Sequence, residues 1–200
     1  MKQPLYFDHA AATPLDPGVF GAMQPYFSEQ FYNPSATYLA GQQVRKNLDA
    51  ARAQVASVLG VRASEIIFTA GGTEANNLAI HGIMEHYPEG NIVVSGVEHE
   101  SVLAPAHVYD CREVAVTSDG RIDLDDLKAK IDDKTVLVSI MYANNEVGTV
   151  QPIREIGQLL ATLRKGRELP LYFHTDACQA ANYLDLHVSR LGVDLLTLNG

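Results

Sequence analysis

Short apolar runs alternate with helical patterns from about residue 60 onward, and this alternation restricts the fold more than any other feature of the sequence. Runs that predict strands lie at 65–70, 91–96, 112–116, 135–142, 171–176 and 193–198. Several of them are apolar without interruption, which is typical of strands that are covered on both faces. Strands that alternate with helices predict a mostly parallel sheet with right-handed crossovers. The expected fold class is therefore α/β, with a sheet between two layers of helices.

The segments between these strands carry apolar side chains at helical spacing. These patterns predict helices over 36–59, 73–87, 101 onward, 124–131 and 153–163. The first sixty residues contain only turn and helix signals. We therefore expect residues 1–60 to form an N-terminal arm of helices and residues 61–200 to form the sheet domain.

Composition and charge exclude several classes of protein. No apolar run is long enough for a transmembrane helix, and the first ten residues lack the apolar core of a signal peptide. A formal net charge of −9 argues against binding to a nucleic acid backbone. The two cysteines, Cys111 and Cys178, supply neither a disulfide framework nor a zinc-binding pair. We expect a cytoplasmic protein that binds no metal, no nucleic acid and no membrane.

Polar and glycine-rich segments follow most of the predicted strands directly. They are GGTE (71–74), VEHES (97–101), ANNEVGT (143–149), DACQ (176–179) and NG (199–200). Ligands of parallel α/β sheets bind beyond the carboxyl ends of the strands. We therefore expect these five segments to converge on one edge of the sheet and to form the site there.

Gly72 and Thr73 lie where a predicted strand passes through two glycines into a helix. Glycine allows a ligand to approach the backbone, and the start of a helix presents unpaired N–H groups with a positive partial charge. These features suit a phosphate group. An ordinary turn with a helix cap explains the same residues, and the absence of a following lysine excludes a Walker loop.

His99 follows a predicted strand and precedes a predicted helix. A histidine at this position could be a base, a metal ligand or a ring stacked on a flat ligand, and it could also simply form a hydrogen bond at the helix start. Its neighbours do not provide metal-ligand spacing. Asn144 and Asn145 follow another strand and are either turn residues or neutral donors to a ligand oxygen.

Asp176 follows a predicted buried strand directly. A buried carboxylate requires a partner charge or several N–H donors, so Asp176 is either a turn cap or the counter-ion of a ligand cation. At about 3 Å and an effective dielectric constant near 20, such an ion pair gains about 5 kcal/mol, enough to keep a weakly basic ring nitrogen protonated. Gln179 could donate to another edge of that ring. A phosphate, a flat ring, a ring oxygen and a protonated ring nitrogen together describe pyridoxal 5′-phosphate.

The chain resembles the cysteine desulfurases of the class V aminotransferase family, which have the fold-type I architecture of pyridoxal phosphate enzymes. The matching segments are YFDHAAATPLDP, NPSA, EIIFTAGGTEANNLAI, VEHESVL, GRIDLDDL, VSIMYANNEVGTVQPI and FHTDACQA. They cover nearly the whole chain in family order. The sheet domain would then be the first part of the large, cofactor-binding domain of that fold.

The resemblance also implies roles for individual residues. Gly72 and Thr73 would hold the cofactor phosphate, and His99 would stack on the ring and assist proton transfer. Asp176 would pair with the ring nitrogen. The side of the ring that carries the hydroxyl would be contacted by Asn145 and Gln179. Asn33 would lie near the substrate.

Some family features are replaced in this chain and others are missing. Ala12 precedes Thr13 where the family has two threonines, and Tyr38 or a neighbour replaces a histidine, which leaves the substrate contacts open. The family's cofactor-binding lysine, mobile loop cysteine and substrate-binding arginine would follow Gly200. We therefore expect the chain to be the N-terminal half of an enzyme about twice as long, with the sheet unfinished and the 200 residues inactive alone.

The resemblance implies an enzyme that removes sulfur from L-cysteine, leaves L-alanine and carries the sulfur as a persulfide for iron–sulfur cluster or thio-cofactor assembly. It also implies a homodimer and a sulfur-accepting partner or scaffold protein. Cys178 is expected to be a bystander. The alternatives are another class V enzyme, such as a selenocysteine lyase or an aminotransferase, and a binding module without catalysis.

Overall fold

The computed structural model describes residues 5–200, which divide into two compact units. The first unit ends at Ile66, and the second spans Ile67–Gly200. All regular structure in the first unit is helical. Its elements are α1 (Pro17–Met23), α2 (Pro25–Ser28), α3 (Leu39–Leu59) and the 3₁₀ helix η1 (Ala63–Glu65). The helix expected over 36–59 is confirmed as α3.

The ends of these helices have local causes. Asp16 caps α1, because its Oδ1 accepts hydrogen bonds from the backbone N–H groups of Gly18 at 2.7 Å and Val19 at 3.1 Å. Helix α3 ends at Gly60, whose φ of 69° lies in the left-handed region that glycine occupies without strain. Neither α1 nor α2 contains a buried residue, so their apolar side chains do not form a core within this unit.

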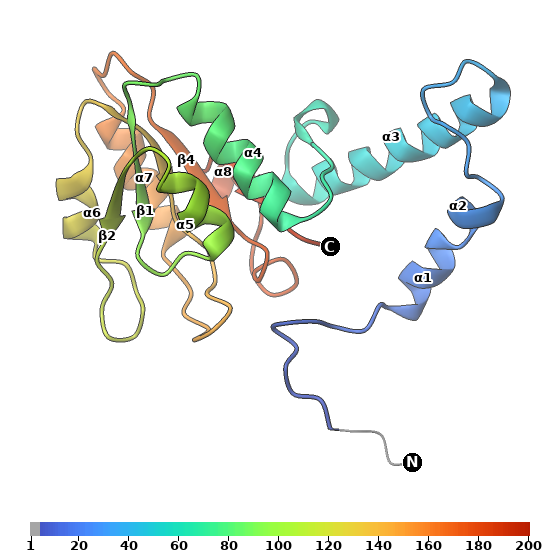
Figure 1. Cartoon of the computed structure of the whole chain (residues 1–200), viewed down its shortest axis with the longest axis horizontal. Helices are drawn as coiled ribbons and strands as arrows, with labels where there is room; N and C mark the ends of the chain where they lie inside the picture. The colour runs from blue at the N-terminus through green and yellow to red at the C-terminus, as the bar shows by residue number, and fades with distance from the viewer. Residues whose placement is uncertain (1–4) are drawn as a thin grey trace. The chain divides into compact units, whose positions relative to one another are not determined.

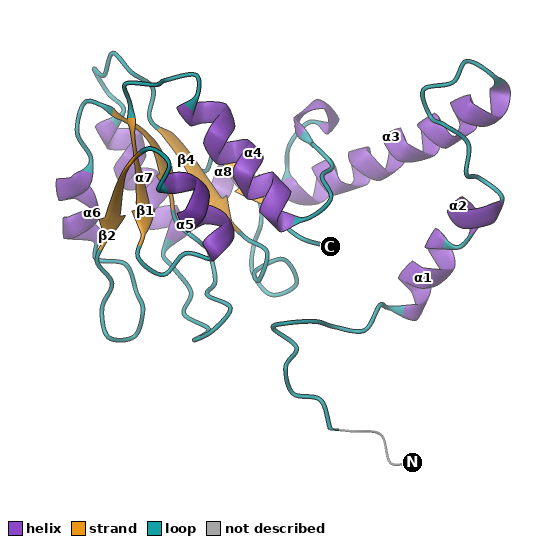
Figure 2. Cartoon of the chain, in the orientation of Figure 1, coloured by secondary structure: helices purple, strands orange, loops and turns teal. Residues whose placement is uncertain are grey.

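The second unit contains a parallel five-stranded sheet with the order β2-β1-β3-β4-β5 (Figure 2). The strands are β1 (Asn91–Ser95), β2 (Asp110–Val114), β3 (Thr135–Ser139), β4 (Tyr172–Asp176) and β5 (Leu195–Thr197). The helices are α4 (Gly72–Met84), α5 (Glu100–Ala106), α6 (Leu124–Lys130), α7 (Ile153–Leu163) and α8 (Val188–Leu191). This arrangement confirms the parallel α/β prediction.

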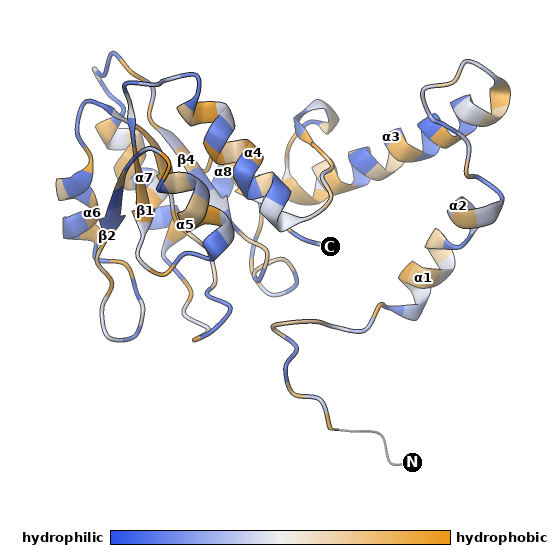
Figure 3. Cartoon of the chain, in the orientation of Figure 1, coloured by the Kyte–Doolittle hydropathy of each residue, from blue (hydrophilic) through white to orange (hydrophobic). Residues whose placement is uncertain are grey.

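Two apolar clusters cover the two faces of the sheet and make three layers. Alternate residues of one strand point into different clusters: Val93 packs with α6 and α7, whereas Ile92 and Val94 pack with α4 and α5. Figure 1 shows α4 and α5 together on one face of the sheet. In Figure 3 the edge strand β2 is largely hydrophilic, in keeping with the partly exposed burial pattern of its sequence DCREV. In the part of the chain that the structure describes, no helix is both long and apolar enough to cross a bilayer.

The strand predicted at 65–70 is wrong. Residues 66–69 have no regular structure, and Ile67 and Phe68 are 70% and 48% exposed. A strand requires a hydrogen-bonded partner, and no strand among the described residues pairs with this segment. The other five predicted strands are present, although β3 and β5 are shorter than expected and β2 begins earlier.

Candidate functional site

The sheet reverses its strand order between β1 and β3. His99, Asn145 and Gln179 lie in the loops after β1, β3 and β4, and Asp176 is the last residue of β4, whereas Gly72 and Thr73 begin α4 and follow no strand of the described chain. Glu98 joins the two strand exits, because its Oε1 accepts a hydrogen bond from the backbone N–H of Met141 at 2.6 Å. The amide of Asn144 donates to the carbonyl oxygen of Val97 at 3.1 Å. The loops after β1 and β3 are therefore held together.

The N-terminus of α4 lies against the turn that follows β4. A Cβ atom added to Gly72 would come within 2.9 Å of Cys178 Sγ, closer than side chains normally approach. Gly71 is the N-cap and supplies no side-chain cap, and Thr73 is exposed in the first turn. Backbone N–H groups at this end of a 13-residue helix remain suited to an anion.

Asp176 is 7% exposed at the end of β4, and neutral donors contact both of its oxygens. The backbone N–H of Cys178 donates to Oδ1 at 3.0 Å, and the amide of Asn76 donates to Oδ2 at 2.7 Å. None of the ion pairs formed by the described residues includes Asp176. This negative charge is therefore nearly buried without a cation from the described chain.

Asn76 links Asp176 to His99 through one serine. The same Asn76 nitrogen donates to Ser101 Oγ at 2.8 Å, and Ser101 Oγ lies 2.8 Å from His99 Nδ1. The backbone N–H of Ser101 also donates to this Nδ1 at 3.1 Å, so His99 is the N-cap of α5. His99 thus forms the hydrogen bond at a helix start that the sequence left open as an alternative. Its ring is also connected to the Asp176 carboxylate through Ser101 and Asn76.

Glu98 and His174 are two further buried ionisable side chains, and both interact electrostatically with Asp176. Burial raises the pKa of Glu98 to about 8, and the charge of Asp176 adds to this rise. Burial lowers the pKa of His174 to about 4, against the opposite effect of Asp176. His174 lies 2.8 Å from Ser139 Oγ and 3.1 Å from Thr197 Oγ1, so both ring nitrogens have partners. Near neutral pH, Glu98 therefore keeps its proton to a large extent and His174 is neutral.

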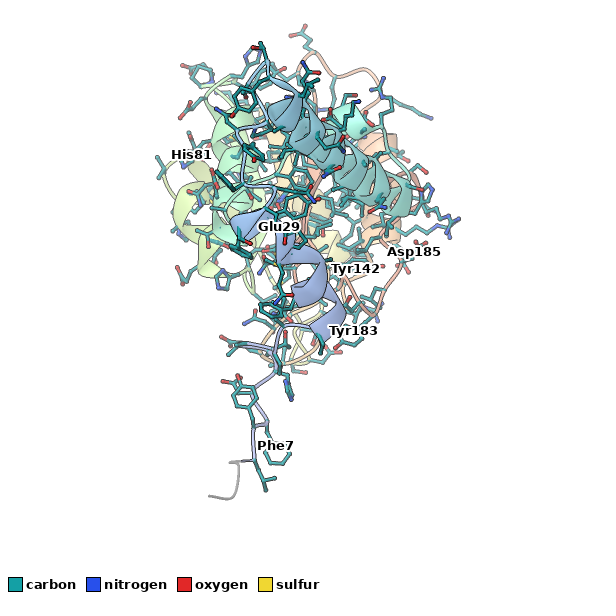
Figure 4. The ribbon with its side chains drawn as sticks, turned by 90° about the vertical axis from the view of Figure 1, so that its right-hand side faces the viewer. Phe7, Glu29, His81, Tyr142, Tyr183 and Asp185 are labelled. Atoms are coloured by element: carbon teal, nitrogen blue, oxygen red, sulfur yellow. The ribbon has the colours of Figure 1, made fainter. Side chains whose placement is uncertain are left out.

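Asn145 and Gln179 lie in the loops after β3 and β4, and both are half-buried. The backbone of the first loop is anchored beside Asp176, because the N–H of Tyr142 donates to the Asp176 carbonyl oxygen at 2.8 Å. Burial and the charge of Asp185 raise the pKa of the Tyr142 hydroxyl, and Figure 4 labels both residues. Asn145, Asp176 and Gln179 therefore lie at the carboxyl ends of β3 and β4. The contacts of Asn145 and Gln179 with a ligand stay predictions.

Asn33 belongs to the first unit, where it forms a local turn. Its Oδ1 accepts a hydrogen bond from the backbone N–H of Ser35 at 2.9 Å, and its carbonyl oxygen accepts one from Ala36 at 3.1 Å. These contacts neither support nor oppose a role in substrate binding, which stays a prediction.

Burial and Asp176 raise the pKa of the Cys178 thiol. The thiolate is the nucleophilic form of cysteine, so this environment opposes nucleophilic reactivity. It supports the prediction that Cys178 is a bystander. Among the described residues, no group of three His, Cys, Asp or Glu side chains is arranged to hold a metal ion.

Sequence reasoning missed Asn76, Ser101 and Glu98. One signal was available for Asn76, because it occupies the same helix face as Ile80 and Met84 at intervals of four residues, and all three are buried. A polar residue at a core position of an apolar stripe requires a hydrogen-bonding partner. No comparable pattern distinguishes Glu98 from the polar residues that follow other strands.

The donor set fits pyridoxal 5′-phosphate. A nearly buried carboxylate without a cationic partner suits a protonated ring nitrogen. The start of α4, next to Cys178, suits a phosphate. Asn76 Oδ1 is also buried, with no hydrogen-bond partner among the described residues. These features lie on connected elements and so suit the two charged ends of one ligand.

Comparison with known proteins agrees with this fit. Residues 5–200 match the family model described as Aminotransferase class-V. Cysteine desulfurase IscS of Dictyoglomus turgidum is 41% identical over 206 residues, which cover 100% of this chain and 51% of that protein. The putative cysteine desulfurase IscS 1 of Bacillus subtilis is 43% identical over 203 residues, with coverages of 98% and 52%.

Two solved structures resemble the chain throughout. The structure described as SspA in complex with cysteine has a TM-score of 0.90 and 36% identity, and covers 98% of this chain and 56% of its own. A NifS-like protein has a TM-score of 0.92 and 31% identity, with coverages of 98% and 55%. The chain spans about half the length of the curated relatives it matches.

Proposed function

The chain belongs to the aminotransferase class-V family, and we propose that the complete gene product is a pyridoxal phosphate-dependent cysteine desulfurase. It removes sulfur from L-cysteine as an enzyme persulfide, leaves L-alanine and supplies the sulfur for iron–sulfur cluster or thio-cofactor assembly. The names of its relatives support the substrate, and one structural neighbour was solved with cysteine.

The nearly buried, cation-free carboxylate of Asp176 is the observation that carries this proposal. When bound, pyridoxal phosphate supplies an electron sink whose strength depends on a protonated ring nitrogen. Asp176 provides the negative charge that favours this protonation, and the donors from Asn76 and Cys178 hold its carboxylate in one orientation. A neutral acceptor at this position would not select the protonated ring.

Other residues of the second unit bind the remaining parts of the cofactor. Gly72 and Thr73 hold the phosphate at the start of α4, and His99 covers one face of the ring from the start of α5. Asn145 and Gln179 contact the side of the ring that carries the hydroxyl. Asn33 of the first unit contacts the substrate.

The proposed partners are L-cysteine, a sulfur-accepting or scaffold protein and a second copy of the same protein. Large apolar side chains are exposed in the first unit, among them Phe7, Phe27 and Phe31 at 87%, 72% and 64%. Exposed apolar patches of this kind are typical of surfaces that another chain covers. They suit a surface that another chain or the rest of the protein covers, and a homodimer is the assembly we propose.

Turnover by the complete gene product tests the function. The purified protein, supplied with pyridoxal phosphate, is expected to be yellow and to convert L-cysteine to L-alanine, with sulfide released in the presence of a thiol reductant. The same assay with L-selenocysteine identifies the alternative activity. A colourless protein that forms no alanine from either substrate contradicts the proposal, and a strong preference for selenocysteine replaces it with a selenocysteine lyase.

A further inference from the structure

We infer that Asn76 and Ser101 are positioning residues that hold neutral His99 in the tautomer whose proton is on Nε2, and that they make this state depend on Asp176. The inference is built from hydrogen-bond directions in the second unit. The tautomer of His99 does not depend on the proposed function. Only the effect of His99 on a bound cofactor ring rests on that function.

The backbone of α5 defines the role of one ring nitrogen. Ser101 N–H is a donor only, and it points to His99 Nδ1 at 3.1 Å. Nδ1 must therefore be an acceptor and carries no proton. A neutral imidazole with an unprotonated Nδ1 carries its proton on Nε2.

The amide of Asn76 defines the direction of the serine hydroxyl. Its nitrogen donates to Asp176 Oδ2 at 2.7 Å and to Ser101 Oγ at 2.8 Å, which uses both amide hydrogens. Ser101 Oγ thus accepts from Asn76 and lies 2.8 Å from His99 Nδ1, to which it donates its own hydrogen. Two donors therefore converge on Nδ1.

Asp176 determines the orientation of the Asn76 amide. Rotating this amide by half a turn would place Oδ1 against the Asp176 carboxylate, with two acceptors facing each other. Asn76 is 1% exposed and Ser101 is 8% exposed, so water does not readily replace these contacts. The chosen orientation leaves Asn76 Oδ1 buried without a partner among the described residues. The contact with Asp176 therefore outweighs the loss at Oδ1.

This arrangement limits the chemistry of His99. The lone pair of Nδ1 is engaged by Ser101, and Nε2 carries the hydrogen. In this state His99 acts toward a ligand as a flat ring and as a hydrogen-bond donor through Nε2. Donating the Nε2 proton needs no prior change, whereas accepting a proton would require Nδ1 to give up its hydrogen bonds from Ser101 or Nε2 to lose its own hydrogen.

Nitrogen NMR of the cofactor-free complete gene product tests the inference. The protein is labelled with ¹⁵N-histidine, and the His99 signals are assigned by their loss in His99→Gln. We expect an unprotonated Nδ1 and a protonated Nε2 in the wild type and in Ser101→Thr, which keeps the hydroxyl. Ser101→Ala keeps the backbone donor to Nδ1 and removes only the hydroxyl donor, so the averaged ring-nitrogen signals should shift part of the way toward the other tautomer. Asn77→Ala is the matched control, since Asn77 donates only to backbone oxygens of Thr73 and Ser101.

A double-mutant comparison tests the dependence on Asp176. Asp176→Asn should shift the His99 ring-nitrogen signals when Asn76 is present and leave them unchanged in an Asn76→Leu background. Circular dichroism identifies any variant that fails to fold. The wild-type spectrum alone decides whether His99 carries its proton on Nε2, even if every variant fails to fold. A protonated Nδ1 in the wild type, or equal shifts in both backgrounds, overturns the inference.

The two proposals can fail separately. A protein that desulfurates cysteine but carries a proton on His99 Nδ1 overturns the positioning role alone. A protein with the expected tautomer that forms no alanine from cysteine overturns the proposed function alone.

Discussion

Gly72 lies so close to Cys178 that a single added methyl group would come within 2.9 Å of the sulfur atom. This contact joins the start of α4 to the turn after β4, and thereby the proposed phosphate position to Asp176. The spacing between the two charged ends of the site therefore depends on a glycine at position 72.

Gly72→Ala should weaken pyridoxal phosphate binding about tenfold, since the methyl group forces the sulfur or the helix start to move. Cys178→Ala removes the sulfur atom and should restore most of the affinity in the double variant. Cofactor titration followed by absorbance measures both effects. Cys178→Ser alone should leave desulfuration almost unchanged. If the double variant binds pyridoxal phosphate as weakly as Gly72→Ala does, the methyl group obstructs the phosphate directly.

Asp176→Asn should reduce the rate of alanine formation by about 10²–10³-fold, because an amide cannot stabilise a cationic ring nitrogen. The measurement is kcat at saturating pyridoxal phosphate. Asp133→Asn is the control, since Asp133 is an exposed aspartate outside the site. A rate near that of the wild type would reduce Asp176 to a cap for the turn at Cys178.

Glu98 should make the protein less stable as the pH rises. Its pKa is raised from 4.5 to about 8, so between these values the folded protein holds a proton that the unfolded chain has released. The free energy of unfolding therefore falls as the pH increases through this window. Glu98→Gln is neutral at every pH and should flatten the decline, with a change of a few kcal/mol at most. Urea unfolding at pH 5, 7 and 9 measures this effect, and Glu89→Gln, at an exposed position, should leave the slope unchanged.

Gly157 and Gly82 should respond oppositely to replacement by alanine. A Cβ atom on Gly157 in α7 would approach the Leu191 carbonyl oxygen to 2.5 Å, so Gly157→Ala should destabilise the fold by about 1–3 kcal/mol. Gly82 lies exposed in α4 with no atom within 4 Å of such a Cβ, so Gly82→Ala should stabilise it by about 1 kcal/mol. Thermal unfolding compares the two, and equal shifts would contradict the packing of α7 on α8.

Much of the second unit could be predicted because its strands are short, apolar and separated by helices with clear periodicity. The segment at 65–70 has the same composition but no partner strand, and pairing is a property of two segments that one run of residues does not encode. The short helices α2 and α8 lack a full period of apolar residues and so produced no clear pattern.

The sequence brought out candidate residues that lie at or soon after the end of a strand, as with His99, Asn145 and Asp176. Asn76 lies inside a helix, and its contact with Asp176 joins residues 100 positions apart. Its role depends on the distance and direction of two hydrogen bonds, and these follow from how α4 packs on the sheet. The pattern of one segment contains no such information.

The strand order also determines when parts of the sheet can form during synthesis. Strand β1 pairs with β2 on one side and with β3 on the other. Because β3 is synthesised after β2 and α6, the second edge of β1 stays unpaired until β3 has emerged. At ordinary translation rates this interval lasts a few seconds, during which an apolar strand edge is open to other nascent chains. A ribosome-associated chaperone would thus have its greatest effect before Leu137 leaves the exit tunnel.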